Sequence, residues 1–313
     1  MNTVDKPVLV ICGPTASGKT RIGIDVAKMI NGEIISADAR QFYKLMDIGT
    51  AKPTVEERAE VPHHLVDFVD INNHLSAADF RELALRKIEE IFARGCNPIV
   101  VGGSGLYIKA LEEGFFEGPK ADHKLRRYLE WKIEKEGIET LYKKLKRIDP
   151  DTAGRLSPND RARIVRALEV HHVTGKSIST LQSEGKYHTT DYKFLKVGIR
   201  LPRDLLYNRI NERVIHMVNS GLVEEVRAVF DSLRPESSHL FKSLGYREFK
   251  GYLDGKHDLD RAIMLTQQKT RNYAKRQLTW FRADSEIKWL DANKPDIAKR
   301  IVEYFKEEVT VGR

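Results

Sequence analysis

Short apolar runs alternate with helically spaced apolar residues over residues 1–112. Strands are predicted at 8–12, 33–37 and 98–101, and the unbroken apolar run at 8–12 is typical of a strand that is buried on both faces. Between them apolar residues recur every three or four positions, and the longest such helix is predicted to begin after Ser76 as its N-cap. This order predicts a parallel sheet covered by helices on both faces, with ligands at the carboxyl ends of the strands.

The pattern changes after about Gly114. Residues 122–182 are charged and helical in period, without a convincing strand. A strand is predicted again at 193–201, helices follow to about Arg282, and 287–290 is predicted to be a closing strand. The predicted domains are a core formed by residues 1–115 and 192–313 and a helical insertion domain formed by residues 116–191.

A phosphate-binding loop follows the first predicted strand. It matches G-x-x-x-x-G-K-T at every fixed position, with the residues Gly13, Pro14, Thr15, Ala16, Ser17, Gly18, Lys19 and Thr20. Because this loop opens a helix, free backbone N–H groups and the helix dipole attract an anion there. Lys19 is then placed to pair with phosphate oxygens, and the Thr20 hydroxyl to ligate Mg²⁺. The predicted fold class is therefore α/β, with a P-loop-type parallel sheet flanked by helices.

Three further side chains are candidates for the crevice at the strand ends. Asp38 follows the second strand, where its carboxylate can accept a proton or hold Mg²⁺ through water; the alternative is a turn or cap aspartate. Ser104 offers a hydroxyl within a Gly-Gly-Ser-Gly turn, which equally suits a turn without a ligand. Arg213 lies on the apolar stripe of a helix that begins near Asp204, so it either faces a counter-charge such as pyrophosphate or snorkels at the stripe's edge.

The charge distribution favours a polyanionic partner. The 313 residues carry a net charge of +8, and residues 120–170 hold 14 Lys or Arg against 9 Asp or Glu. Residues 269–283 hold five basic residues and no acid. Arg163 and Arg166 share one face of a helix whose predicted N-cap is Ser157, and they are candidates to grip a nucleic-acid backbone. An ordinary solvated face is the alternative for each cluster.

Other classes of protein are disfavoured. Two cysteines, Cys12 and Cys96, do not make a disulfide framework or a zinc site, and the adjacent histidines point apart. No apolar run approaches the ~20 residues of a membrane helix, and no targeting peptide is visible, so we expect a cytoplasmic protein.

The combination of motifs resembles the tRNA dimethylallyltransferases, also called tRNA isopentenyltransferases, over nearly the whole chain. The motifs that carry the resemblance are the phosphate loop, Ser36 to Tyr43, Met46 to Pro53, Pro62 to Leu65, Val101 to Tyr107, Asn159-Asp160, Arg166 to Val170, Gly245 to Arg247, and Ala274 to Trp280. The phosphate loop is shared with many enzymes, whereas Met46 to Pro53 and the late Lys-Arg-Gln are specific to this family.

The resemblance implies transfer of a dimethylallyl group from its pyrophosphate to N6 of the adenosine that is 3′ to the anticodon of tRNA, assisted by Mg²⁺. It implies that the phosphate loop holds the donor's pyrophosphate, that Asp38 is the base, that Ser104 lies beside the reacting groups and that Arg213 contacts the donor's phosphates. The residues it implies for tRNA contact are Asp38, Ala39, Arg40, Gln41, Ser104, Ala162, Arg163, Ile164, Val165, Arg166, Arg247, Lys275 and Arg276. The expected partners are the tRNA anticodon stem-loop and dimethylallyl pyrophosphate, with no membrane, and the expected state is a monomer.

The sequence departs from the family pattern at three positions. Ala39 stands where serine is usual, Ser104 replaces threonine but keeps the hydroxyl, and Leu45 occupies a position that is often glycine. None removes a group that the mechanism needs, although Ala39 loses one hydroxyl contact to tRNA. Phe42 and Tyr43, next to the base, are candidates to pack near a flipped adenine.

Three rival functions remain at this point. A P-loop small-molecule kinase shares the loop but leaves the basic insertion unexplained. An adenylate isopentenyltransferase shares the donor but uses a free nucleotide, and a large polyanion suits the basic clusters better. A tRNA-binding module without catalysis is opposed by the intact Lys19, Thr20 and Asp38.

Overall fold

The computed structural model describes residues 6–114, 118–119, 121–184, 190–234, 240 and 243–311. Its strands are β1 (Lys6–Cys12), β2 (Gly32–Ser36), β3 (His63–His64), β4 (Asn97–Gly102), β5 (Tyr192–Arg200) and β6 (Lys288–Asp291). Its helices are α1 (Lys19–Met29), α2 (Val55–Glu60), α3 (Ala77–Ala93), α4 (Gly105–Glu113), α5 (His123–Glu136), α6 (Ile138–Ile148), α7 (Pro150–Arg155), α8 (Arg161–Thr174), α9 (Ile178–Glu184), α10 (Arg203–Asn219), α11 (Leu222–Ser232), α12 (Tyr246–Leu253), α13 (Leu259–Arg282) and α14 (Ile297–Val311).

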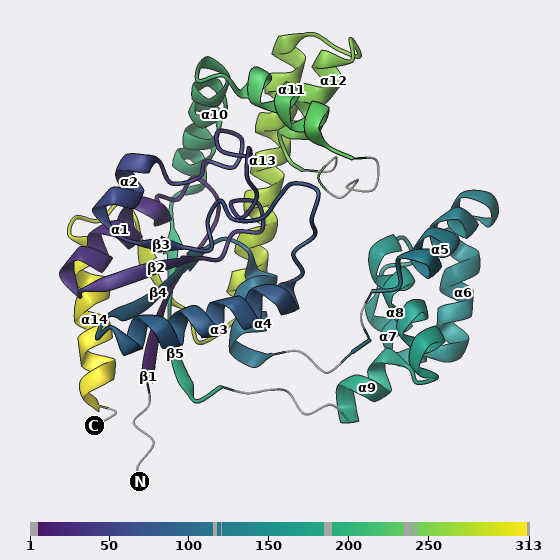
Figure 1. Ribbon diagram of the computed structural model, residues 1–313, viewed down its shortest axis with the longest axis horizontal. Helices are drawn as coiled ribbons and strands as arrows, with labels where there is room; N and C mark the ends of the chain where they lie inside the picture. The colour runs from purple at the N-terminus through teal and green to yellow at the C-terminus, as the bar shows by residue number, and fades with distance from the viewer. Residues whose placement is uncertain are drawn as a thin grey trace. The chain divides into compact units, whose positions relative to one another are not determined.

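The six strands form one parallel sheet in the order β3-β2-β4-β1-β5-β6. Helices lie against both faces, as Figure 1 shows for α1 and α14 on one side and α3 and α4 on the other. The predicted α/β fold with a P-loop-type sheet is confirmed. The two-residue strand β3 was not predicted, because a pair of histidines has no apolar run to reveal it.

The alternation of side chains along β1 explains why this sheet has two cores. Val8, Val10 and Cys12 point into a core formed with α3, α4 and the helices α11 to α13. Leu9 and Ile11 point into the opposite core, against α1 and α14. All five residues are almost completely buried, so the central strand, and with it the loop that follows, is fixed from both sides.

The contacts divide the chain into two compact units. One comprises Met1–Glu112 and Thr190–Arg313, and the other comprises Glu113–Thr189. The second unit holds α5 to α9 around its own core, which includes Leu129, Leu145 and Ile164. The expected boundary between residues 115 and 116 lies outside the described residues, and the expected boundary at 191 is close to the observed one.

The predicted cap of the arginine-bearing helix is wrong. Ser157 and Pro158 form a turn, and α8 begins only at Arg161. Asp160 is its N-cap, because its carboxylate accepts the backbone N–H of Arg163 at 3.3 Å while the backbone N–H of Asp160 bonds back to Ser157 at 2.9 Å. An aspartate in reach of the first turn also complements the helix dipole, which the serine does not.

Candidate active site at the carboxyl ends of the strands

The phosphate loop links β1 to α1 and is a tight turn that needs glycine at both ends. Gly13 lies so close to β5 that a Cβ there would sit 2.5 Å from the carbonyl oxygen of Ile199. Gly18 caps α1 with a φ of +91°, a conformation that favours glycine. The Ser17 hydroxyl is buried in the loop without a hydrogen-bond partner among the described residues. The loop therefore holds an unsatisfied oxygen beside free helical N–H groups, which suits a phosphate or a hard cation.

Lys19, Arg213 and Asp38 form the charged centre of the site. The Lys19 ammonium donates to the carbonyl of Pro14 at 2.7 Å, and the Arg213 guanidinium reaches the Thr15 hydroxyl at 3.4 Å. Burial lowers the pKa of Lys19 to about 8; Asp38 opposes this shift, and Arg213 adds to it. Burial likewise lowers the pKa of Arg213, and Asp38 again opposes the shift. Two buried cations thus lie within the electrostatic range of one carboxylate at the carboxyl ends of the strands.

Ser104 fixes the backbone next to Asp38. Its hydroxyl accepts the backbone N–H of Ala39 at 3.0 Å, so the turn after β4 holds the turn after β2. One Asp38 oxygen accepts the backbone N–H of Arg40 at 2.9 Å. Asp38 is therefore both the turn aspartate of the alternative interpretation and a crevice carboxylate, and its second oxygen is oriented by that turn.

Gln277, the glutamine of the late Lys-Arg-Gln motif, is a site residue for which no role was predicted from the sequence. From α13 its amide carbonyl accepts the backbone N–H of Thr15 at 2.9 Å, and its amide nitrogen donates to the Gly103 carbonyl at 2.8 Å. A Cβ at Gly103 would lie 2.3 Å from that nitrogen, so only glycine leaves room for this side chain. Gln277 clamps the phosphate loop to the turn that carries Ser104. The available signal was its place on the buried stripe of α13, where a polar side chain needs partners.

Tyr273, one turn before Gln277, also lies at the site. Its phenol lies near the Ser104 side chain and within the electrostatic range of Asp38. Burial, and after it the charge of Asp38, raises the pKa of Tyr273 to about 12, so its hydroxyl stays protonated at neutral pH. Helix α13 therefore presents a phenol and an amide to the turn that carries Ser104.

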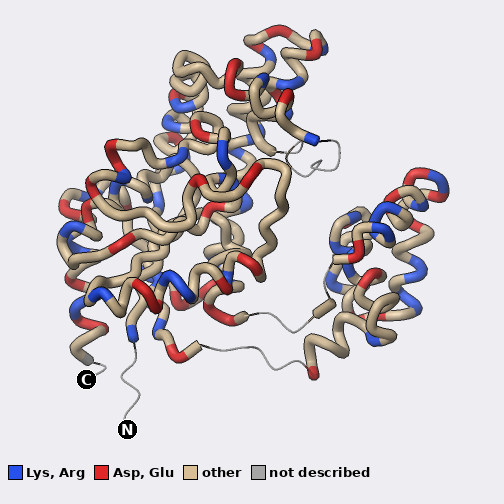
Figure 2. Tube along the Cα trace, viewed as in Figure 1, with Lys and Arg blue, Asp and Glu red and all other residues tan. Residues whose placement is uncertain are grey.

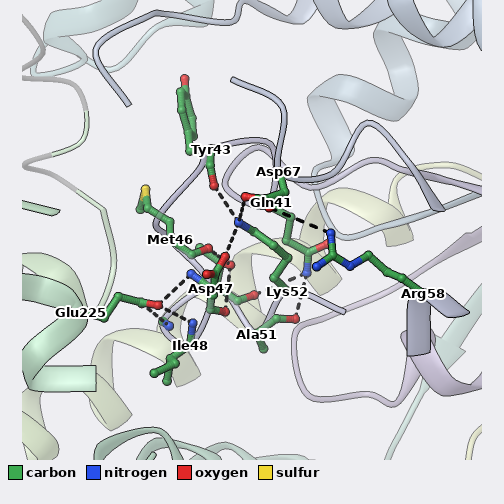
Figure 3. A network of polar contacts seen from close by, with 12 residues as sticks. Gln41, Tyr43, Met46, Asp47, Ile48, Ala51, Lys52, Arg58, Asp67 and Glu225 are labelled. Atoms are coloured by element: carbon green, nitrogen blue, oxygen red, sulfur yellow. Dashed lines mark hydrogen bonds and ion pairs between the residues drawn. The ribbon is translucent and has the colours of Figure 1, made fainter. Parts of the chain in front are cut away.

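The segment from Met46 to Pro53 is held by the buried ammonium of Lys52 and by the carboxylate of Glu225 (Figure 3). The Lys52 ammonium, with only 3% of its side chain exposed, donates to the Tyr43 carbonyl at 2.8 Å and to Asp67 at 2.7 Å, and it also pairs with Asp47. Glu225 of α11 accepts the backbone N–H groups of Asp47, Ile48 and Gly49 within 2.9 Å. The Tyr246 hydroxyl donates to the same carboxylate at 2.6 Å.

This segment in turn supports Gln41, three residues after Asp38. Gln41 donates to the carbonyls of Thr50 and Ala51 and accepts from the Ser36 hydroxyl. Leu45 has a φ of +65° with its side chain half exposed, and this backbone conformation favours the glycine that the resemblance leads us to expect at this position.

The rings of Phe42 and Tyr43 do not face the crevice. Both are almost completely buried, and Phe42 packs against Phe80 and Tyr107 at centroid distances of 5.7 and 5.6 Å. The suggestion that they pack near a flipped base is wrong, because their apolar surface is used to hold the segment after β2 onto α3.

The residues predicted to contact tRNA fall into two groups. Lys275 and Arg276 are exposed on α13, and Arg247 at the start of α12 is 55% exposed although it pairs with Glu248. On α8 the Arg163 side chain is 66% exposed and Ala162 is exposed, but Ile164 and Val165 lie in the core of the insertion unit.

Arg166 is already engaged within its own unit. Its guanidinium donates to the fully buried Glu169 at 2.6 Å and to the Pro119 carbonyl at 3.0 Å. Arg126 binds the other side of the same carboxylate through two hydrogen bonds. If α8 contacts tRNA, Ala162 and Arg163 present the free surface, and Arg166 is a structural ion pair with one edge exposed.

Comparisons with known proteins agree on one family. The IPP transferase family model matches residues 41–284. A tRNA dimethylallyltransferase of Geobacter metallireducens is 49% identical over 91% of this chain and 92% of its own. The solved tRNA isopentenylpyrophosphate transferase of Bacillus halodurans is 40% identical, with a TM-score of 0.71 and 98% of both chains covered. A eukaryotic dimethylallyltransferase, solved acting on tRNA, is 29% identical with a TM-score of 0.82 over 98% of this chain and 80% of its own. The chain belongs to the IPP transferase family.

Proposed function

We propose that this protein transfers a dimethylallyl group from dimethylallyl pyrophosphate to N6 of the adenosine 3′ to the anticodon of tRNA. The observation that carries the proposal is the meeting of Asp38, Lys19 and Arg213 in one crevice beside a phosphate loop. A simple anion-binding site gains nothing from a carboxylate in this place, whereas a kinase uses one as base or as Mg²⁺ ligand, so the carboxylate by itself favours catalysis and not one transferred group over another. Membership of the family supports the choice of prenyl donor and tRNA.

Asp38 provides the base. The exocyclic amine of adenine is a weak nucleophile because its lone pair is delocalised into the ring. A carboxylate that accepts one N–H proton increases the electron density on nitrogen, which attacks the allylic carbon as the bond to pyrophosphate oxygen breaks. The turn to the Arg40 backbone holds the carboxylate in place without consuming its second oxygen.

Lys19 and Arg213 stabilise the leaving pyrophosphate. Negative charge grows on its oxygens as the allylic carbon becomes cation-like, and fixed cations in a desolvated crevice stabilise that charge strongly. The Thr20 hydroxyl, at the start of α1, and the pyrophosphate oxygens offer the hard oxygen ligands that Mg²⁺ prefers. When bound, Mg²⁺ supplies further neutralisation of the leaving group. The unpartnered Ser17 hydroxyl fits the same polar cradle.

The test of the proposal is transfer of labelled dimethylallyl groups, with Mg²⁺, to unmodified tRNA and separately to free AMP. We expect label in tRNA alone, at the adenosine next to the anticodon. Label in AMP would show that the acceptor is a free nucleotide and not tRNA. Label in neither, together with turnover of a nucleoside triphosphate, would show that the reaction is phosphoryl transfer.

The lowered pKa of Lys19 predicts a pH dependence of donor binding. The bound pyrophosphate favours the ammonium form, so binding above pH 8 requires proton uptake, and affinity is expected to fall by about tenfold per pH unit from there. Calorimetry with dimethylallyl pyrophosphate in buffers of different ionisation enthalpy measures both the affinity and the number of protons taken up. Lys28→Met, on the exposed face of α1, should keep this dependence, and Lys19→Met should lose it. An affinity that is flat from pH 7 to 9.5 would contradict the role of Lys19.

We propose that the protein acts in the cytoplasm as a monomer. No helix in the described part of the chain has the length and apolar character to cross a membrane. Sedimentation at working concentration tests the monomeric state.

A further inference from the structure

An exposed aromatic pair lies on α5 of the insertion unit. Tyr128 and Trp131 are each 51% exposed, and their rings stack on each other with centroids 6.0 Å apart and planes at 25°. Large aromatic side chains left in solvent lose the benefit of burial, and a pair that is already stacked presents a broad, rigid π surface. The buried face of α5, with Leu129 and Ile133, lies opposite, so the unit's own core does not explain these rings.

Basic side chains bracket the pair. Lys124, Tyr128, Trp131 and Lys135 follow one another at helical spacings of four, three and four, so they form one stripe along α5. Both lysines are exposed, and no ion pair joins either to a carboxylate among the described residues, whereas Arg126 and Lys132 on the same helix are paired. The stripe spans about 16 Å, which suits a short length of chain rather than a single ion. Figure 2 shows basic residues recurring on the surrounding helices of this unit.

We propose that this stripe, Lys124-Tyr128-Trp131-Lys135, is a stacking surface for an unpaired base of the RNA substrate. Bases stack on aromatic rings in any sequence, and flanking lysines bind the phosphates on either side. The free lysines favour a polyanion over an apolar protein partner, which would leave them desolvated and unpaired. This inference rests on the proposed function, because it names a further contact of the same tRNA.

The stacking contact is tested by binding of an unmodified tRNA transcript to the full-length protein at several salt concentrations. Tyr128→Ala/Trp131→Ala is expected to weaken binding roughly tenfold, with an unchanged salt dependence, because stacking releases no counterions. Lys124→Ala/Lys135→Ala is expected to lower the slope of log affinity against log salt by about 1 to 2. Tyr128→Phe/Trp131→Phe keeps both ring faces and should bind within about twofold of the parent protein.

Steady-state kinetics distinguish this contact from the active site. The alanine pair should raise the KM for tRNA and leave kcat and the KM for the donor unchanged, with an unaltered thermal midpoint. If the alanine pair bound tRNA as tightly as the parent protein, the stacking surface would be overturned. It would also be overturned if the alanine pair lost self-association but kept RNA binding, since a second copy of the chain would then occupy the stripe. If the parent protein itself neither binds nor modifies tRNA, the proposed function fails first.

Discussion

Asp38→Asn is expected to lower the rate of prenyl transfer by about 10²- to 10⁴-fold, the usual contribution of a positioned general base. Asparagine is nearly isosteric, and its side-chain oxygen can still accept the Arg40 backbone N–H that holds the turn. The variant therefore loses the proton acceptor while the crevice keeps its shape. Single-turnover transfer at saturating tRNA and donor measures the chemical step, and tRNA affinity should stay within about twofold.

The matched control is Asp25→Asn, which removes an exposed aspartate from α1 far from any role in the crevice. It should transfer at the parent rate. Near-full turnover of Asp38→Asn would remove the carboxylate from the mechanism.

Lys52→Met is expected to lower the free energy of unfolding by about 3 kcal/mol. The methionine fills much of the same space but leaves the Tyr43 carbonyl and the Asp67 carboxylate without their buried cation. Asp47 and Asp67 keep partial access to water, which holds the loss below that of a fully buried charge. Urea unfolding measures the change as a lower midpoint at constant slope.

The control for this prediction is Lys28→Met, which breaks an exposed pair with Glu60. Exposed pairs contribute at most about 1 kcal/mol, so its midpoint should barely move. Transfer activity should also fall in Lys52→Met, since the segment it loosens supports Gln41 beside Asp38. Equal midpoints for the two variants would show that the Lys52 contacts do not stabilise the fold.

Local patterns in the sequence predicted the fold and several residues of the candidate site. The apolar runs at 8–12 and 98–101 and the glycine-rich loop are each encoded within a few consecutive residues, so they predicted β1, β4 and the phosphate loop directly. The position of Arg213 on an apolar stripe indicated a charge directed inward, and the structure places it against Thr15. Roles for these residues in catalysis remain predictions.

The tertiary structure determined the contacts between segments that lie far apart in the chain. Gln277 reaches a loop 262 positions earlier, and Glu225 holds backbone N–H groups 176 to 178 positions away. Arg166 forms an ion pair with Glu169, and Phe42 is buried in the core. Both outcomes depend on which elements pack together. The sequence by itself determined the parallel sheet, the phosphate loop and the interruption by a helical unit, since hydrophobic period and turn chemistry are local. Which polar side chains meet in the crevice, and which are used to hold it together, followed only from the folded chain, because a hydrogen-bond partner hundreds of residues away leaves no local pattern.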